Sequence, residues 1–159
     1  TQEYRRISKS DTDRVKMLLA EIAVLSSYIK RRKHLTLLAD RDCKVAVSEL
    51  ERAFSESLQT LKLLNVRNTL YVDSELSTLS GKNAAAILDF YEEVIEADLE
   101  NLTSVQISLA NINGLRLSLN VCCEADLSIF LNKGNVIYEM DDDAGYQHLV
   151  FIIEGGAAV

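Results

Sequence analysis

A short acidic stretch, LDFYEEVIEADLE at residues 88–100, contains the residues whose spacing is best suited to chemistry. Glu92 and Glu96 are one helical turn apart, so in a helix both carboxylates lie on the same face. Paired carboxylate oxygens are good ligands for a hard cation such as Mg²⁺. The same spacing also occurs on solvated acidic faces. The elements that surround this helix must therefore decide between a working site and a plain surface.

The other residues that could do chemistry do not form a recognisable site. Cys122 and Cys123 are adjacent, which excludes a C-x-x-C pair, and with Cys43 they give an odd number that does not indicate a disulfide framework. A reducing compartment is therefore expected. His148 has no cysteine or acidic neighbour at a ligand spacing and is predicted to be a strand surface residue. The acidic stretch at 138–146 lacks the ligand pattern of an EF-hand and is predicted to be a solvated turn.

Length and composition indicate one globular domain, or a compact domain with a helical appendage. The 159 residues are 48% hydrophobic and 26% charged, and the formal net charge is -7. This acidity argues against nucleic-acid binding, because the protein would repel the phosphate backbone. No apolar run reaches about 18 residues, so no membrane span is expected. The first residue is not Met, which suggests a segment of a longer protein, with any membrane part upstream and a cytoplasmic location for this segment.

Residues 11–39 are predicted to form a long amphipathic helix, with Ser10 or Asp11 as its N-cap. Its apolar residues recur at alternating spacings of three and four, which is a heptad pattern. The helix either packs on its own domain or pairs with the same helix of a second chain. The basic run KRRKH at 30–34 is predicted to be a solvated helix end, and 39–44 is a candidate linker. The heptad positions are Val15, Leu18, Ile22, Leu25 and Ile29.

The remaining sequence alternates between helical and strand patterns. Asn65 is predicted to end a helix in the left-handed conformation, Gly134 closes another, Ser80 is a candidate N-cap, and Asn113-Gly114 signals a hairpin turn. Helices among hairpin-linked strands predict an α+β fold with a mixed sheet, one face covered by helices and the other more exposed. The predicted helices span 45–66, 79–102 and 123–134, and the predicted strands span 68–75, 104–111, 115–122 and a hairpin at 135–156 that turns at 141–145.

Three phrases of the sequence resemble the C-terminal cytoplasmic region of bacterial sensor histidine kinases. They are ELERAFSESLQTLKLLNV, GKNAAAILDFYEEVIEADLENLTSVQISL and GLRLSLNV, in that order. The resemblance covers residues 11–156 and is similar to a clostridial type, in which a helix ending like SYIKRRKHLTLL precedes a reduced ATPase-like domain. It implies an N-terminal helix or helical hairpin at 1–44, for dimerisation or as a linker, followed by a degenerate ATPase-like α/β sandwich at 45–159.

The resemblance also implies roles for the acidic helix. Glu92 falls on the Glu that positions or activates the reacting groups in the family, and Glu96 falls on the Asn that ligates the magnesium bound to ATP. A carboxylate there is a hard ligand, but it adds negative charge beside an anionic triphosphate. Glu124, with Cys122 and Cys123, falls on the family's adenine turn and lacks its glycines, so side chains would stand where the nucleotide should sit. A degenerate site is therefore implied, with no cofactor expected and weak or absent binding of ATP and Mg²⁺.

The phosphoacceptor histidine of the family has no clear equivalent in this sequence. His34 is followed by Leu35 and lies near the predicted helix end, whereas the family's histidine lies inside the helix and precedes an acidic residue. His34 is therefore expected to be an exposed residue beside the basic run rather than a phosphoacceptor. The expected partners are a second copy, through the N-terminal helices, and a response regulator. Nucleic acid is not expected, and a membrane is expected only through an upstream segment.

Three functions remain as hypotheses. The first is a signalling module that acts by dimerisation and partner contact, with weak or absent ATP binding. The second is an active histidine kinase or phosphotransferase in which Glu92 and Glu96 hold Mg²⁺, since a sporulation phosphotransferase also joins a helical hairpin to a reduced ATPase-like domain. The third is an α+β domain that binds a small effector. The other carboxylates of the acidic stretch are predicted to form a solvated face: Asp89, Glu93, Asp98 and Glu100.

Overall fold

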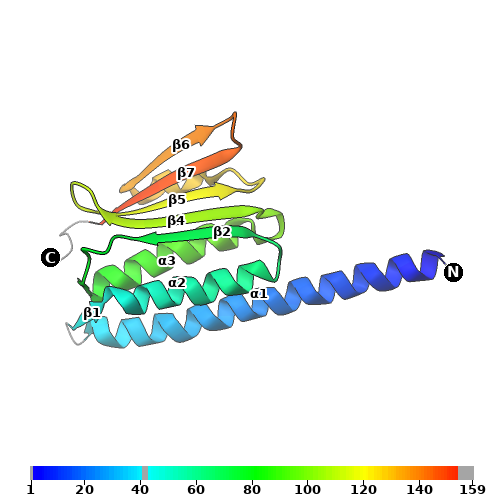
Figure 1. The fold of residues 1–159 in the computed structure, drawn as a ribbon, viewed down its shortest axis with the longest axis horizontal. Coiled ribbons are helices and arrows are strands. Elements are labelled where there is room, and N and C mark those ends of the chain that lie inside the picture. Colours follow the sequence, from blue (N-terminus) through cyan, green and yellow to red (C-terminus); the bar gives the residue numbers. More distant parts are fainter. Residues whose placement is uncertain (1, 41–42, 154–159) are drawn as a thin grey trace.

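The computed structural model describes residues 2–40 and 43–153. It consists of a five-stranded sheet with helices stacked on one side (Figure 1). In chain order the elements are α1 (Gln2–Asp40), β1 (Lys44–Ala46), α2 (Val47–Lys62), β2 (Arg67–Val72), β3 (Thr78–Ser80), α3 (Gly81–Ala97), η1 (Leu99–Asn101), β4 (Ser104–Asn111), β5 (Leu115–Cys122), η2 (Leu127–Lys133), β6 (Val136–Asp141) and β7 (Tyr146–Ile153).

The sheet is mixed, as the sequence predicted. Its strand order is β2-β4-β5-β7-β6, in which β2 runs parallel to β4 and every other neighbouring pair is antiparallel. β1 and β3 form a separate two-stranded antiparallel sheet. The predicted hairpin turn is confirmed, because Asn113 and Gly114 have φ angles of 53° and 108°, and such left-handed values suit these two residue types. The α+β fold with a mixed sheet is therefore confirmed.

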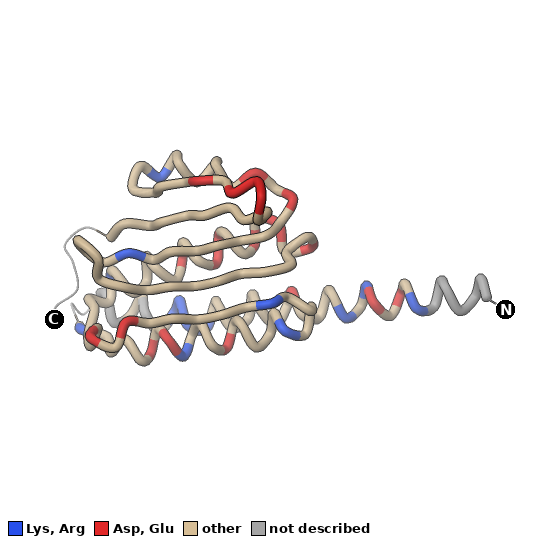
Figure 2. The backbone as a smooth tube through the Cα atoms, turned by 45° about the horizontal axis from the view of Figure 1, so that its top comes forward, with Lys and Arg blue, Asp and Glu red and all other residues tan. Residues whose placement is uncertain are grey.

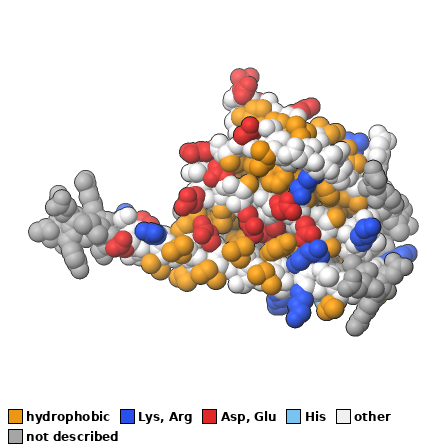
Figure 3. Space-filling model, turned by 180° about the vertical axis from the view of Figure 1, so that it is seen from behind, with side chains coloured by type: hydrophobic (Ala, Val, Ile, Leu, Met, Phe, Trp, Pro, Cys, Tyr) orange, Lys and Arg blue, Asp and Glu red, His pale blue; other side chains and the backbone are white. Residues whose placement is uncertain are grey.

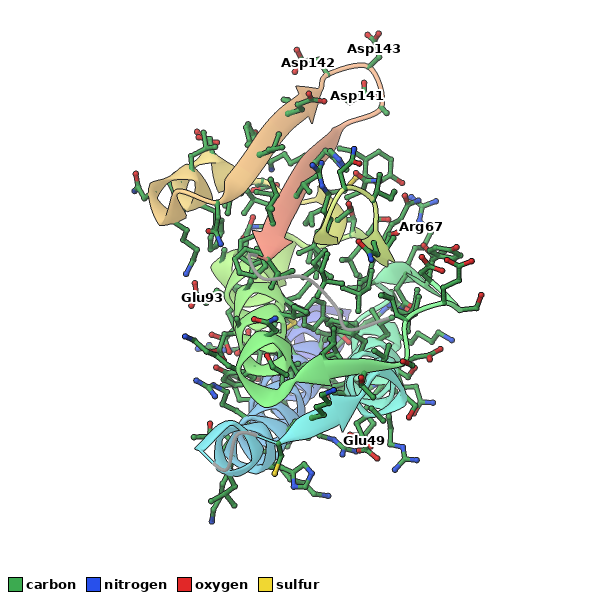
Figure 4. All side chains as sticks on the ribbon, turned by 90° about the vertical axis from the view of Figure 1, so that its left-hand side faces the viewer. Glu49, Arg67, Glu93, Asp141, Asp142 and Asp143 are labelled. Atoms are coloured by element: carbon green, nitrogen blue, oxygen red, sulfur yellow. The ribbon has the colours of Figure 1, made fainter. Side chains whose placement is uncertain are left out.

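The helices form two layers on one face of the sheet. α2 and α3 lie next to the sheet, and α1 lies on their far side, over the groove between them (Figures 1 and 4). The ring of Phe90 on α3 stacks on Phe151 of β7, with centroids 4.6 Å apart. The next residue, Tyr91, reaches α2, where its hydroxyl lies 2.8 Å from Ser57 Oγ and its ring meets Phe54 edge-on. α3 is therefore the helix that contacts the sheet, α2 and α1.

The two faces of the sheet differ in polarity, as predicted. The face toward the helices is apolar and buried, whereas the open face carries a row of polar side chains on neighbouring strands. Asn120 Nδ2 donates to Gln106 Oε1 at 3.2 Å, and His148 Nδ1 lies 2.5 Å from Asn120 Oδ1. His148 is thus a surface residue of a strand, as expected. The buried face includes Val105, Ile107, Leu109, Leu115, Leu117, Leu119, Val121, Leu149 and Phe151.

The N-terminal helix is longer than predicted and packs on its own domain. α1 begins at Gln2, so the predicted N-cap at Ser10 or Asp11 is wrong. It continues to Asp40, so the basic run is not a helix end either. Two side chains of the basic run bind α2 and α3 instead. Arg31 Nε donates to Glu56 on α2 at 3.1 Å, and Arg32 lies 2.6 Å from Asp89 on α3. The candidate linker at 39–44 falls partly outside the described residues. The packing face of α1 contributes Ala20 and Val24 to the buried residues.

Most other predicted boundaries are close to the observed ones. β4 and β5 have the predicted bounds, Asn65 has the predicted left-handed conformation with φ 60°, and Gly134 closes η2 with φ 83°. α3 ends at Ala97 rather than at residue 102, because a 3-10 turn follows it. β1 and β3 were not predicted, because strands of three residues are too short to show a period of two.

Candidate functional site: the carboxylates of α3

α3 begins at a side-chain cap and presents its acidic residues away from the sheet. Ser80 Oγ accepts a hydrogen bond from the backbone N–H of Asn83 at 3.0 Å, which confirms the predicted N-cap. The apolar side chains of α3 fill the core between the sheet and α2. Its carboxylates therefore meet α1, η2 and the turn after β5, and each can be followed to its partner.

Glu92 is buried and has an unpaired oxygen. The side chain is 3% exposed, and its Oε2 has no hydrogen-bond partner among the described residues. Burial, with a smaller contribution from Glu96, raises the pKa of Glu92 to about 8. Burial also raises the pKa of Tyr28 on α1 to about 12, helped by Asp89 and, more weakly, by Glu92. Glu92 therefore lies at the junction of α3 with α1, where it is neutral below about pH 8.

Glu96 lies one turn farther along and is exposed. Its pKa is raised, first by partial burial and then by repulsion from Glu93. Among the residues that the structure describes, no three His, Cys, Asp or Glu side chains are grouped closely enough to hold a metal ion. The Glu92 and Glu96 pair is thus on one helical face, as predicted, but one carboxylate is enclosed while the other is open to solvent.

Two further carboxylates of α3 hold neighbouring elements. Asp89 Oδ1 accepts a hydrogen bond from the Tyr28 hydroxyl at 2.9 Å and pairs with Arg32. Glu93 Oε2 lies 2.6 Å from Lys133 Nζ at the end of η2. Figure 4 shows Glu93 on the outer side of α3. The prediction of a solvated face is therefore wrong for Asp89, which binds α1, but is confirmed for Glu93, which is exposed and pairs with Lys133 at the surface.

Asp98, directly after α3, holds the turn that corresponds to the predicted adenine turn. Its Oδ2 accepts backbone hydrogen bonds from Glu124 at 2.9 Å and from Ala125 at 2.8 Å. These contacts, led by the Ala125 N–H, lower the pKa of Asp98. The prediction of a solvated Asp98 is wrong. Glu124 itself takes part through its backbone N–H.

Gln147 binds the same turn from the sheet side and was missed by the sequence analysis. It is 4% exposed, and its Oε1 accepts from the backbone N–H of Leu127 at 2.8 Å and from the Tyr138 hydroxyl at 3.0 Å. Its Nε2 donates to the carbonyl of Ala125 at 2.8 Å and lies 3.6 Å from Cys123 Sγ. Together Asp98 and Gln147 occupy three N–H groups and one carbonyl of the 124–127 turn.

Replacing Asp98 by alanine will loosen this turn. We expect a loss of about 1–2 kcal/mol in the free energy of unfolding, because two backbone donors lose a charged acceptor. Amide hydrogen exchange at Glu124 and Ala125 will become faster, and urea denaturation will report the stability. Glu100→Ala is the control, since Glu100 is an exposed carboxylate near the same end of α3. Unchanged amide exchange at Glu124 and Ala125 in Asp98→Ala would show that the turn is stable without Asp98.

The histidines do not join the carboxylates of α3. His34 is exposed on α1, next to a pocket of 530 Å³ that Lys30, Lys33 and Glu49 also line. It is therefore an exposed residue within the basic run, as expected. His148 lines a separate pocket of 260 Å³ on the open face of the sheet, near the acidic turn. Neither pocket includes Glu92, Glu96 or Glu124.

The more apolar face of α1 points away from the body. We call the five heptad positions 15, 18, 22, 25 and 29 the seam; their exposed fractions range from 42% at Leu25 to 62% at Ile29. Figure 3 shows apolar side chains in a row along this helix. The face of α1 toward α2 and α3 has two buried residues, Ala20 and Val24, and three partly buried ones, Tyr28, Arg31 and Arg32. An exposed stripe of this kind marks an interaction surface.

Charge is also unevenly distributed between α1 and the rest of the chain. Residues 2–40 contain nine basic and five acidic side chains, whereas the rest contains eight basic and nineteen acidic ones. Figure 2 shows acidic residues on the elements above α1 and on the β6–β7 turn. The basic helix α1 therefore lies on an acidic remainder of the domain. Arg31 and Arg32 form ion pairs with Glu56 and Asp89 across this contact.

The sequence analysis missed the roles of Gln147 and Asp98, and only Gln147 had a signal in the sequence. Gln147 has the inward phase of its strand, with Leu149, Phe151 and Ile153, so a polar residue at an apolar position was a usable signal. Asp98 gave no such signal, because its partners lie 26 and 27 residues away in a loop.

No described helix is long and apolar enough to cross a membrane.

Comparison with known proteins finds similarity at the level of structure. No protein-family model and no curated protein matches the sequence. The histidine kinase domain of a blue-light activated histidine kinase from Erythrobacter litoralis matches with a TM-score of 0.55 and 14% identity, over 81% of this chain and 74% of that one. The cytoplasmic segment of histidine kinase QseC gives 0.48 and 13%, over 87% and 95%. The Acinetobacter baumannii histidine kinase AdeS gives 0.43 and 12%, over 89% and 84%. On the first of these matches, the chain has an α+β fold similar to that of a histidine kinase domain.

Proposed function

We propose that this chain is a signalling module of a histidine-kinase-like protein, which acts by pairing with a second copy and by contact with a partner. Its binding of ATP is weak or absent. The observation that carries the proposal is the exposed seam of α1, because an apolar heptad stripe outside the domain core needs a partner helix. A response regulator is the partner class that the fold suggests for the signalling contact.

The surroundings of the α3 carboxylates support weak or absent ATP binding. A nucleotide at this turn would need free backbone groups and room for the base, yet Asp98 and Gln147 already bind the 124–127 turn. Glu92 lies at the junction with α1, and burial raises its pKa and favours the neutral carboxyl, which is a poor partner for a cation. In this proposal the carboxylates of α3 hold the fold together instead of serving phosphoryl transfer.

Replacing Ile22 by aspartate will separate the paired chains. Ile22 is 58% exposed at the centre of the seam, so the change leaves the core intact but places a charge in the interface. We expect a dimer for the original chain and at least a tenfold weaker dimer for Ile22→Asp, measured by analytical ultracentrifugation. The matched control is Ile129→Asp, since Ile129 is 60% exposed on η2. Equal association of all three proteins would refute pairing through the seam.

ATP binding is tested by thermal unfolding with and without MgATP. A ligand that binds only the native state raises the midpoint by mass action. We expect a change below about 1 °C at millimolar MgATP, because Asp98 and Gln147 already occupy three N–H groups and one carbonyl of the turn. A saturable increase that disappears on chelation of magnesium would favour the active kinase or phosphotransferase instead.

A further inference from the structure

β6 lies at the edge of the five-stranded sheet, and no described strand pairs with its outer side (Figure 1). The backbone N–H of Ile152 on β7 donates to the carbonyl of Asn135 at 2.9 Å. Bonded and non-bonded pairs alternate along an antiparallel ladder, so every second residue from Asn135 onward bonds to β7. The backbone N–H and C=O groups of Val136, Tyr138 and Met140 therefore point outward, where a further strand can pair with them.

The side chains of β6 differ between the two faces of the sheet. Tyr138 and Met140 lie opposite Leu149 and Gln147 of β7, on the face toward the helices, whereas Glu139 lies opposite His148 on the open face. Met140 is 49% exposed. A strand added to β6 would therefore have an acidic neighbour on the open face and apolar neighbours on the other face.

The negative charge around β6 is not neutralised within the described part of the chain. None of the ion pairs there includes Glu139 or the aspartates at 141–143. Burial raises the pKa of Tyr138, and the charges of Asp126 and Asp142 raise it further. Figure 2 shows the acidic residues of the β6–β7 turn. Charges of this sign oppose a second copy of β6 and favour a basic segment at the same edge.

A pocket of 260 Å³ on the open face lies beside these carboxylates. A side chain of an added strand directly opposite Glu139 would have its Cβ about 4.5–5.5 Å away. From there a lysine or arginine head group reaches the carboxylates of the pocket, while its aliphatic stem covers the neighbouring apolar surface. The pocket is lined by Asn120, Glu139, Met140, Asp141, Tyr146 and His148.

We propose that β6 binds an extended segment of a partner protein as an added strand, and that this segment alternates basic and apolar side chains. The basic side chains face Glu139 and Asp141, and the apolar ones lie beside Tyr138 and Met140. Main-chain hydrogen bonds provide affinity in this mode of binding, and alternate side chains provide specificity. β6 and α1 lie on opposite sides of the fold (Figure 1), so this contact goes beyond the proposed function and does not depend on the pairing of α1.

A short acetylated peptide of alternating lysine and valine is the probe. Calorimetry measures its dissociation constant, and nuclear magnetic resonance measures amide hydrogen exchange with and without the peptide. We expect slower exchange of the backbone N–H groups of Val136, Tyr138 and Met140 in the complex, because these are the outward donors of β6. A matched peptide with glutamate in place of lysine is expected to bind at least tenfold more weakly.

Charge reversal on the protein tests which carboxylates attract the peptide. One variant carries Glu139→Lys and Asp142→Lys at the edge. The matched control carries Glu51→Lys and Glu75→Lys, which change the net charge equally at exposed positions on α2 and between β2 and β3. At physiological salt, which screens distant charges, we expect the lysine peptide to bind the first variant at least tenfold more weakly and the control within about twofold of the original chain.

Backbone methylation of the peptide tests the strand pairing itself. Successive N–H groups of an extended peptide point to opposite edges, so the valine N–H groups lie on one edge and the lysine N–H groups on the other. Only one edge faces β6. Methylating the backbone nitrogens of all valines, or of all lysines, will therefore abolish binding in one case and preserve it in the other.

Each outcome decides for or against the added strand. Slower exchange along β6, loss of binding on charge reversal at the edge, and loss with one methylated peptide support it. Equal weakening in both charge variants, or the same result with both methylated peptides, overturns it. Slow exchange of the outward groups without peptide, increasing with protein concentration, makes a second copy the occupant and also overturns it. Ile22→Asp should bind the peptide as the original chain does, which separates this contact from the pairing of α1.

Discussion

Replacement of Gln147 by alanine will reduce the free energy of unfolding by about 3–5 kcal/mol. The side chain is 4% exposed and contacts four groups, so its removal takes this partner from the Leu127 N–H, the Tyr138 hydroxyl, the Ala125 carbonyl and the Cys123 thiol. Each stranded buried group costs about 1–3 kcal/mol, and the cavity adds to the loss. Urea denaturation at a fixed protein concentration measures the change.

The matched control for Gln147→Ala is His148→Ala. His148 is the next residue of β7 but points to the open face of the sheet, where it contacts Asn120. A half-exposed side chain with one polar partner is expected to cost about 1 kcal/mol or less. If both variants lost the same stability, the network around Gln147 would not be what holds the 124–127 turn.

Replacement of Glu92 by glutamine will stabilise the protein at alkaline pH and leave it almost unchanged at acidic pH. Burial raises the pKa of Glu92 from 4.5 to about 8 in the folded chain. The stability contribution is therefore complete below about pH 4.5 and is lost as the pH rises through about 8, because the folded state must then release a proton that it binds tightly. Glutamine resembles the protonated carboxyl, so it removes this loss.

The size of the effect follows from the difference between the two pKa values. A difference of this size corresponds to at most about 5 kcal/mol, and relaxation around the charged group reduces it, so we expect a gain of about 3 kcal/mol for Glu92→Gln near pH 9. Urea denaturation near pH 5 and near pH 9 gives the comparison. Glu96→Gln is the control, because Glu96 is exposed and should show a much smaller change. A pH-independent difference between Glu92→Gln and the original chain would contradict the burial argument.

The sequence predicted the sheet better than it predicted the surroundings of α3. β4 and β5 have clear alternation and a diagnostic Asn-Gly turn, so local signals were sufficient for them. The partners of α3 come from long-range contacts: Tyr28 is 61 residues from Asp89, and Glu124 is 26 residues from Asp98. A helical period shows which residues share a face, but not which element will cover that face. For this reason the shared face of Glu92 and Glu96 was predicted, whereas the burial of Glu92 against α1 was not.

The seam shows a second limit of pattern reasoning. The heptad spacing of α1 left two interpretations open, packing on its own domain or pairing with a second chain. The structure has α1 packed on α2 and α3 through Ala20 and Val24, while the heptad residues lie on the opposite face. The strongest apolar periodicity of a helix therefore need not mark the face that packs within its own domain.

The position of β6 at the edge of the sheet has a consequence for solubility. An edge strand offers unpaired backbone groups to any other extended chain, and β6 also exposes Ile137 and Met140. Glu139 on the strand and the acidic turn at 141–143 oppose such strand addition, because a second copy would bring the same charges close together. Figure 4 shows the three aspartates of this turn at the tip of the hairpin. If these charges were removed, aggregation by edge-to-edge pairing should begin at β6 rather than at the covered face of the sheet.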